Sequence, residues 1–346
     1  MVTYCDHYQR GDTSLFSTMG SQSAKKTMRI EELIGFGLPG QIVAVLKERG
    51  FKELNPIQVA ALESGLLSGS NLVVVAPTSS GKTLIAELAA VHHGIKAKGT
   101  FYVFSLKALA EEKYELFKRF WTIGHEPILK TAITTGDRDF EDDNLSQCKI
   151  TFATYEKLYT LIRDNPSLLD RVSLIIIDEM QMLGDRSRGL ILETLVTIIR
   201  VRNPRIQIIG LSAAMPNPED VAAWMNAKVC KTSVRDIPLV EEVWSESRIH
   251  SKLFGTGTED LQERSNPAQT VDTLAIVRLQ VAAGRTPVIV FCMTKPRTED
   301  LARAHYALVR QEGFSSKVKN ALNDLKQRLL FLERRRPNRE IADGRY

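Results

Sequence analysis

The sequence lacks the features that mark membrane, secreted or metal-binding proteins. It has no run of 18 uncharged apolar residues, so no segment is predicted to span a membrane. No basic region followed by an apolar core begins the chain, which argues against a secretory signal. The four cysteines, at positions 5, 148, 230 and 292, form no C-x-x-C pair, and the six histidines have no metal-ligand spacing. We therefore expect an intracellular protein, cytoplasmic or in the nucleoid or nucleus, with reduced thiols.

Outside the C-terminal 32 residues, the sequence has no excess of positive or negative charge. The net charge is +5, but residues 315–346 alone hold nine Lys or Arg against four Asp or Glu. The other 314 residues therefore carry 37 charges of each sign. The overall charge is weak evidence for a nucleic-acid partner, because basic residues of the main body must act through local patches.

A phosphate-binding loop is the strongest positive signal. The stretch 76–83 reads APTSSGKT, with the apolar run 72–75 before it and helix-forming residues after it. A buried strand, a tight loop and a helix N-terminus in this order bind nucleotide phosphates through backbone N–H groups and the helix dipole. The alternative is a loop that merely contains Gly-Lys-Thr, and the flanking pattern argues against it. The expected phosphate contacts are Ala76, Pro77, Thr78, Ser79, Ser80, Gly81, Lys82 and Thr83.

Two residues of this loop have specific expected roles. Lys82 would reach the β- and γ-phosphates, and the Thr83 hydroxyl would ligate Mg²⁺. Ala76 stands where the general pattern has its first glycine, which is tolerable provided that its φ is negative.

A pair of carboxylates, Asp178-Glu179, follows a second apolar strand pattern. In a parallel sheet Asp178 can lie beside Thr83 and hold Mg²⁺ directly or through water. Glu179 would then orient or deprotonate the attacking water as a general base. An N-cap for the next helix is the alternative. Ser212, at the end of a further strand pattern, could sense the γ-phosphate or form only a tight turn of small residues, and spacing alone favours neither.

Strand and helix patterns alternate with short connections from residue 72 to residue 225. This alternation predicts an α/β fold, a doubly wound parallel sheet flanked by helices, with ligands at the carboxyl ends of the strands. The predicted strands are 72–75, 100–105, 129–133, 149–153, 173–178 and 205–211, and the predicted helices include 56–67, 109–121, 155–164, 189–200 and 218–225.

The chain divides into four predicted parts. Residues 1–28 form a disordered leader, 29–235 the phosphate-loop domain, 236–270 a linker and 271–346 an incomplete second domain. Within the last part we expect a helix over 270–283, a strand over 287–291, a helix after Pro296 and a basic amphipathic helix over 318–332.

Taken together, the motifs resemble a superfamily 2 helicase of the Ski-like DExH group, in wording closest to archaeal-type DNA repair helicases that act on stalled forks. The resemblance implies that 29–235 is a complete RecA-like domain that uses ATP and Mg²⁺. It also implies a partner of single-stranded or forked nucleic acid, with DNA favoured over RNA. Gln58 would read the adenine edge, and Gln181 and Ser212 would belong to the nucleotide site. The matching stretches, in family order, are 50–58, 76–83, 105–114, 135–137, 153–157, 178–181, 211–225 and 288–294.

The same resemblance implies a groove for the phosphate backbone of one strand, lined by Lys107, Thr135, Gly136, Thr154 and Lys157. Short hydroxyls, glycine N–H groups and helix N-termini bind phosphates without reading sequence. Outside the motif context, Lys107 or Lys157 would be a solvated surface lysine. Salt bridges explain Arg186 and Arg188 nearly as well as nucleic acid does, and the cluster 334–336 is typical of a solvated helix end.

Three departures from the family pattern bear on activity. Gln181 replaces the usual His, and Ala214 replaces the usual Thr; Gln still donates and accepts hydrogen bonds, so altered coupling is expected. No stretch like motifs V and VI, with their arginine fingers, occurs before Tyr346, and such arginines contribute about 10³–10⁵ in rate. We expect the chain alone to bind ATP–Mg²⁺ weakly, hydrolyse it slowly and leave duplexes unwound, and a protein partner could supply the missing second domain.

Two other functions remain open. The chain could be an ATP- and nucleic-acid-binding half of a split helicase with little activity alone. It could also be a phosphate-loop kinase or transporter-type ATPase without a nucleic-acid role, which the order of the motifs argues against.

Overall fold

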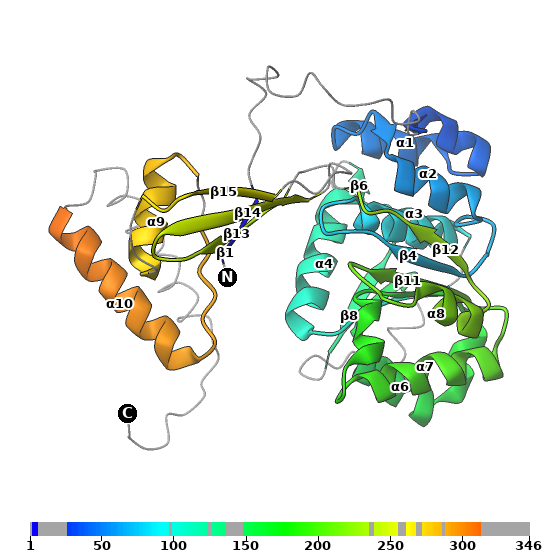
Figure 1. Ribbon diagram of the computed structural model, residues 1–346. Coiled ribbons are helices and arrows are strands. Elements are labelled where there is room, and N and C mark those ends of the chain that lie inside the picture. Colours follow the sequence, from blue (N-terminus) through cyan, green and yellow to red (C-terminus); the bar gives the residue numbers. More distant parts are fainter. Residues whose placement is uncertain are drawn as a thin grey trace. The chain divides into compact units, whose positions relative to one another are not determined.

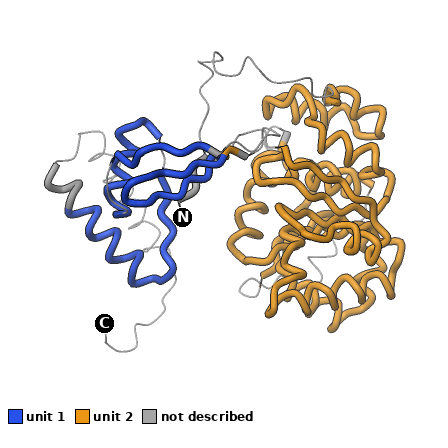
Figure 2. Tube along the Cα trace, viewed as in Figure 1, with its two compact units in different colours: residues 1–6, 240–252, 261–346 blue, residues 7–239, 253–260 orange. Residues whose placement is uncertain are grey.

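The computed structural model describes residues 2–5, 26–96, 99–123, 126–135, 148–234, 239–254, 261–267, 272–285 and 288–312. Two compact units make up the chain (Figure 2): the larger contains 7–239 and 253–260, and the smaller contains 1–6, 240–252 and 261–346. Over the described ranges, every helix is too short or too polar to cross a bilayer.

A seven-stranded sheet forms the centre of the larger unit (Figure 1). Its strand order is β12-β4-β11-β10-β5-β9-β8, and every pairing is parallel, which confirms the predicted α/β class. The strands are β4 (Leu72–Val75), β5 (Gly99–Phe104), β8 (Thr131–Thr134), β9 (Ile150–Thr154), β10 (Val172–Ile177), β11 (Gln207–Ser212) and β12 (Lys228–Lys231).

Both faces of this sheet are buried. Successive side chains point to opposite faces, so Leu72 and Val74 of β4 pack into one core and Val73 and Val75 into the other. Strands buried on both faces read as continuous apolar runs, which is why the sequence pattern identified them. The first core is covered by α1 (Gly40–Glu48), α2 (Pro56–Glu63), α3 (Lys82–Ile95) and α4 (Lys107–Phe120), and the second by α6 (Tyr155–Asp164), α7 (Gly189–Arg202) and α8 (Pro218–Met225) (Figure 1).

Short elements complete the larger unit. They are the paired strands β2 (Met28–Arg29) and β3 (Glu53–Leu54), the paired strands β6 (Thr122–Ile123) and β7 (Glu126–Pro127), and the 3₁₀ helices η1 (Ile30–Phe36), η2 (Pro166–Arg171) and η3 (Met180–Gly184).

Helix α2 begins at Pro56, as predicted. The Gln58 N–H donates to Asn55 Oδ1 at 3.2 Å, and the Asn55 N–H donates to Gln58 Oε1 at 2.9 Å. This reciprocal cap satisfies donors that a helix N-terminus leaves unpaired, and Pro56 at the first helical position has no N–H to satisfy. The cap also holds the Gln58 side chain at the start of the helix.

The smaller unit has a four-stranded sheet of order β1-β13-β14-β15, and its described residues include helices α9 and α10. Helices α9 and α10 lie where the sequence predicted helices. The elements are β1 (Val2–Cys5), β13 (Leu239–Trp244), β14 (Arg248–Phe254), β15 (Leu261–Ser265), α9 (Thr273–Ala282) and α10 (Lys295–Glu312).

Three predictions for these regions need correction. The expected linker, 236–270, contains β13, β14 and β15, and the expected leader, 1–28, contains β1. The polar composition of 236–270 suggested a loop, but an antiparallel strand needs only one apolar face. In β14, for example, Ile249 is buried while its neighbours Arg248 and His250 are exposed. The strand expected over 287–291 does not form within the described residues 288–291. The helix expected over 318–332 and the arginine cluster lie outside the described residues, and the domain limits remain a prediction.

A buried ion pair joins the first core to the loop after α1. The Arg49 guanidinium lies 2.7 Å from the Glu87 carboxylate and between the rings of Phe51, Phe120 and Trp121. The Trp121 indole N–H also donates to Glu87, at 3.1 Å. Burial raises the pKa of Glu87, although the charge of Arg49 and the two hydrogen bonds oppose the rise.

Replacing Arg49 with Met is expected to lower the free energy of unfolding by about 3–5 kcal/mol at neutral pH, because Glu87 would stay buried without its cation. Loss of Arg49 raises the folded-state pKa of Glu87 further. The destabilisation should therefore shrink as the pH falls and Glu87 becomes protonated. Urea denaturation of both proteins at about pH 8 and about pH 5.5 measures the difference.

The double variant Arg49→Met/Glu87→Gln is the matched control. It removes the orphaned charge, so it should be more stable than Arg49→Met alone. Equal destabilisation at both pH values, or a double variant no more stable than the single one, would contradict the account.

Candidate nucleotide and nucleic-acid site

The predicted site residues lie at one edge of the sheet. The register pairs Phe104 with Thr154, Ile177 with Val103, and Ser212 with Val75, so the strands end together. The phosphate loop follows β4, Asp178 follows β10, and Ser212 ends β11. On the same edge, Lys107 follows β5, Thr135 follows β8 and Thr154 ends β9. The parallel topology thus brings together the nucleotide residues on three neighbouring strands and the nucleic-acid residues on the next three.

The phosphate loop combines two residues in the left-handed region. Gly81 has φ 85° and Ser79 has φ 62°. Left-handed backbone is ordinary for glycine and costly for serine, and such strain gathers at functional sites. Ala76 is not among the positive-φ residues, so it meets the condition for replacing the first glycine. Its N–H donates to the carbonyl of Ser212 at 3.0 Å, which ties the start of the loop to the end of β11.

Inside this loop, the Lys82 ammonium donates to the carbonyls of Ala76 and Pro77, the latter at 2.7 Å. The Ser80 hydroxyl donates to the same Pro77 carbonyl at 2.6 Å. Lys82 and Thr83 stand in the first turn of α3, where backbone N–H groups have no partners within the helix. Carbonyls of the loop itself therefore hold the Lys82 ammonium. In a nucleotide complex, phosphate oxygens would replace these carbonyls as its hydrogen-bond acceptors.

The Gln58 side chain braces the phosphate loop. Its Nε2 donates to the Gly81 carbonyl at 3.2 Å, and Asn55 Nδ2 donates to the Ser80 carbonyl at 2.9 Å. A Cβ at position 81 would lie 2.3 Å from Gln58 Nε2, so only glycine permits this approach. Gln58 is buried, with 4% of its surface exposed. Both ends of its amide thus bind the protein itself, and adenine recognition by Gln58 remains a prediction.

The carboxylate pair occupies a sharp turn at the end of β10. Asp178 accepts a hydrogen bond from the Glu179 N–H at 3.0 Å, and Glu179 has φ 55°. Burial is the largest cause that raises the pKa of Asp178; the charge of Glu179 raises it further, while Lys113 and Lys82 oppose the rise. The Asp178 carboxylate therefore binds the backbone of the turn that carries Glu179.

Gln181 links the carboxylates to β11. Its Nε2 donates to the Glu179 carboxylate, and its Oε1 accepts from the Ser212 hydroxyl at 2.8 Å. The Ser212 hydroxyl also lies 3.0 Å from the Ala214 carbonyl, and its single proton serves one of the two acceptors at a time. Spacing left Ser212 undecided between a sensor and a tight turn; the structure connects it to the predicted base through one side chain.

Met180 packs the turn after β10 against the sheet. It is fully buried against Gly210 of β11, where a Cβ would lie 1.9 Å from the Met180 sulfur. Any larger residue at position 210 would displace Met180, and with it the flanking residues Glu179 and Gln181. Glycine here is a requirement of packing, because its φ is not positive.

The carboxylates of Asp178 and Glu179 and the hydroxyl of Thr83 are oxygen ligands of the kind that a nucleotide-bound Mg²⁺ takes. Two neighbouring acidic side chains at a buried strand end favour a cation, and Mg²⁺ typically takes one or two protein oxygens together with phosphate oxygens. Where the structure describes the chain, it holds no cluster of three or more His, Cys, Asp or Glu that could bind a metal alone. Asp178 and Thr83 are the residues that would hold the ion.

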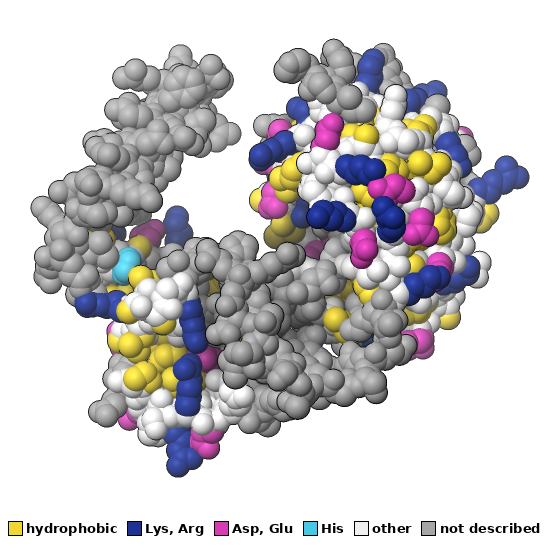
Figure 3. All heavy atoms as spheres, turned by 90° about the horizontal axis from the view of Figure 1, so that it is seen from above, with side chains coloured by type: hydrophobic (Ala, Val, Ile, Leu, Met, Phe, Trp, Pro, Cys, Tyr) yellow, Lys and Arg dark blue, Asp and Glu magenta, His cyan; other side chains and the backbone are white. Residues whose placement is uncertain are grey.

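The nucleic-acid residues divide into buried and exposed ones. Thr154 is 5% exposed, and its hydroxyl accepts from the Lys157 N–H at 3.3 Å as the N-cap of α6. Thr135 is fully buried, and its hydroxyl has no partner among the described residues. Lys107 is exposed in the first turn of α4, and Gly136 lies outside the described residues. In the view of Figure 3, lysine and arginine side chains of the larger unit stand among acidic ones.

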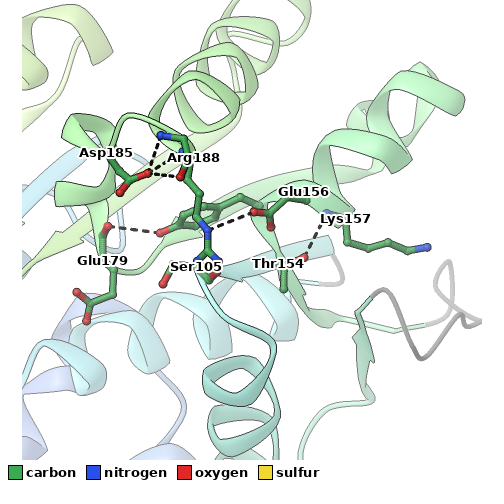
Figure 4. Close-up of polar contacts among 9 residues, drawn as sticks. Ser105, Thr154, Glu156, Lys157, Glu179, Asp185 and Arg188 are labelled. Atoms are coloured by element: carbon green, nitrogen blue, oxygen red, sulfur yellow. Dashed lines mark hydrogen bonds and ion pairs between the residues drawn. The ribbon is translucent and has the colours of Figure 1, made fainter. Parts of the chain in front are cut away.

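Arg188 contacts two of the predicted motifs, 105–114 and 153–157 (Figure 4). Its guanidinium donates to the Ser105 carbonyl at 2.7 Å and lies 4.0 Å from the Glu156 carboxylate. The Asp185 carboxylate accepts from the Arg188 N–H at 2.8 Å. The salt-bridge interpretation of Arg188 therefore accounts for its position.

Tyr155 is a site residue that the sequence did not identify. Its hydroxyl donates to the Asp178 carbonyl and lies 3.4 Å from the Glu179 carbonyl. Burial raises the pKa of Tyr155 above its ordinary value, so the phenol keeps its proton. A tyrosine at the start of a helix reads as core from sequence, and only the fold shows that it reaches β10.

The comparisons with known proteins agree with this geometry. Residues 55–221 match the family model described as DEAD/DEAH box helicase. The ATP-dependent DNA helicase Hel308 of Pyrobaculum calidifontis is 34% identical over 295 residues, which are 85% of this chain and 39% of that protein. The proteins of the same name from Pyrococcus horikoshii and Caldivirga maquilingensis are 44% identical over 213 residues (61% of this chain, 28% of the relative) and 39% identical over 249 residues (71% and 32%).

This chain spans less than two-fifths of the length of each of these relatives. The matched region begins at Asn55 and ends within α8, so it includes the phosphate loop, the carboxylate pair and Ser212. The resemblance to a superfamily 2 helicase is confirmed, and residues 55–221 form a helicase domain of the DEAD/DEAH box family.

Proposed function

We propose that this chain is the ATP-hydrolysing core of a helicase, whose turnover is stimulated by single-stranded nucleic acid. The observation that carries the proposal is the arrangement at the sheet edge. Phosphate loop, carboxylate pair and Ser212 meet on β4, β10 and β11, while the nucleic-acid motifs end the adjoining strands β5, β9 and β8. A kinase or transporter ATPase has no need of the second set.

DNA is the proposed track. The three relatives carry the name ATP-dependent DNA helicase, and the similarity to each extends over most of this chain. Lys107, Lys157 and the N-terminus of α6 are groups that bind phosphates, so sequence-independent binding is expected. Whether RNA serves equally is an outcome of the test below.

In the proposed mechanism, each residue does what its place on the edge permits. Lys82 leaves the Ala76 and Pro77 carbonyls and pairs with the β- and γ-phosphates, with the loop N–H groups beside it. Asp178 and Thr83 would hold a Mg²⁺, which would neutralise phosphate charge. Glu179 accepts a proton from the water that attacks the γ-phosphorus, and the bond from that phosphorus to the bridging oxygen breaks so that ADP leaves.

Gln181 would set the orientation of the base. A carboxylate held by an amide cannot swing away from the water, and the amide in turn is held by Ser212 of β11. Because the Ala76 N–H binds the Ser212 carbonyl, the same strand end contacts the phosphate loop. Base and phosphate loop are therefore proposed to keep a fixed relation through Ser212.

The decisive measurement is the ATPase rate with and without single-stranded DNA or RNA. We expect DNA to raise the rate, Lys82→Ala to abolish it, and Glu179→Gln to lower kcat by about 10²–10⁴-fold while a fluorescent ATP analogue still binds. A rate that neither polymer changes would contradict the nucleic-acid role. ATP turnover that survives Lys82→Ala would contradict the site.

A second prediction concerns the bridge between Glu179 and β11. Gln181→Ala should lower kcat by about 10- to 100-fold, the value of one hydrogen bond to a charged group, with little change in nucleotide affinity. Ser212→Ala should lower kcat as well. The double variant should lose little more than Gln181→Ala alone, since both changes break one chain of contacts. Multiplicative losses would show that the two residues act separately.

A further inference from the structure

Tyr155 occupies an unusual place between the two halves of the sheet edge. It is the first residue of α6 and follows Thr154, the last residue of β9. Its side chain is fully buried in the second core, in the cluster that includes Val103, Ile177 and Met180. Strand β5 separates β9 from β10 in the sheet. The ring therefore passes beneath β5 to reach the end of β10.

At that end, the Tyr155 hydroxyl donates to the Asp178 carbonyl, with the Glu179 carbonyl 3.4 Å away. These carbonyls belong to the left-handed turn that orients the predicted base. A left-handed non-glycine residue is costly and persists only when its surroundings hold it. The hydroxyl is one of the groups that hold it, through the backbone carbonyls, while Gln181 binds the Glu179 side chain.

On the other side, the backbone of Tyr155 continues into the proposed nucleic-acid contacts. The neighbouring Thr154 hydroxyl caps α6 through the Lys157 N–H, so a phosphate bound there contacts the same turn of helix. A second link runs in parallel, because Arg188 connects Glu156 to the carbonyl of Ser105 (Figure 4). Two independent contacts thus join the start of α6 to the segment that follows β10.

Burial alone does not account for the hydroxyl. Tyr102 of β5 is also buried, at 1% exposure, and its hydroxyl has no hydrogen-bond partner in the part of the chain that the structure describes. A phenylalanine would fill the volume of either ring. What distinguishes Tyr155 is the pair of carbonyls that its hydroxyl meets.

We propose that Tyr155 is a positioning residue that couples nucleic-acid contact at the start of α6 to the orientation of Glu179. The proposal rests on the proposed function of the site and names the route by which the strand stimulates hydrolysis. When a phosphate backbone seats against Thr154 and Lys157, the helix start moves with it, and the hydroxyl carries that movement to the carbonyls of the carboxylate pair. Tyr155 itself touches neither nucleotide nor nucleic acid.

The test compares Tyr155→Phe with the matched variant Tyr102→Phe and the unchanged protein. Tyr155→Phe should reduce the stimulation of kcat by single-stranded DNA by about three- to tenfold, the value of one hydrogen bond. The KM for ATP and the affinity for DNA, from fluorescence anisotropy, should stay within about twofold. Tyr102→Phe should keep the full stimulation. Unchanged stimulation in Tyr155→Phe, or an equal loss in both variants, would overturn the proposal.

A second readout separates this proposal from the proposed function. The affinity for a non-hydrolysable ATP analogue is measured with and without single-stranded DNA, which reports coupling without turnover. If the unchanged protein shows coupling but no hydrolysis, the proposed function fails, while a smaller coupling factor in Tyr155→Phe still supports the positioning role. An equal factor in both proteins, or no coupling in the unchanged protein, would refute that role.

Discussion

A parallel sheet brings the carboxyl ends of its strands to one edge, and the candidate site depends on that constraint. Seven strands run in the same direction. The residues that follow their carboxyl ends are far apart in the sequence but lie along the same edge of the sheet. The proposed nucleotide residues follow or end strands β4, β11 and β10, and the proposed nucleic-acid residues follow or end β5, β9 and β8. The boundary falls between β10 and β5. Arg188 and Tyr155 make contacts that span it.

Local strain accompanies this arrangement. Among described residues, Ser79, Glu179 and Asn226 are the non-glycine residues with positive φ, and the first two belong to the phosphate loop and the carboxylate pair. Side chains at the starts of neighbouring helices hold both turns: Asn55 and Gln58 at the start of α2 bind the carbonyls of Ser80 and Gly81, and Tyr155 of α6 binds the turn after β10. The packed sheet therefore offsets the cost of geometry that the proposed chemistry requires.

Much of this fold follows from the sequence, because strands buried on both faces leave an unmistakable pattern. The runs at 72–75 and 173–178 predicted the strand that precedes the phosphate loop and the strand that ends at the carboxylates. The start of α2 at residue 56 was also predicted. The strands of 239–265 were missed, since a sheet with one solvated face needs fewer apolar residues than composition suggests.

Sequence analysis could name many of the candidate site residues, but it could not predict which of them contact one another. The family resemblance could name Gln181, and spacing could suggest Ser212, but neither could give the hydrogen bond between them, which depends on how η3 packs over β11. The contact of Tyr155 with the Asp178 carbonyl could not be predicted, because it crosses the intervening strand β5 and depends on the strand order of the assembled sheet. Gln58 differs in another way: the motif suggested a ligand contact, while its amide binds the helix cap and the phosphate loop.

The central claim is that one sheet edge holds a nucleotide half and a nucleic-acid half. Amide hydrogen exchange with and without each ligand tests it most directly. The account predicts that a non-hydrolysable ATP analogue with Mg²⁺ slows exchange in residues 76–84 and 178–184. Single-stranded DNA should slow exchange at the starts of α4 and α6. Protection by the analogue outside residues 76–84 and 178–184, or by DNA away from those two helices, would contradict this arrangement.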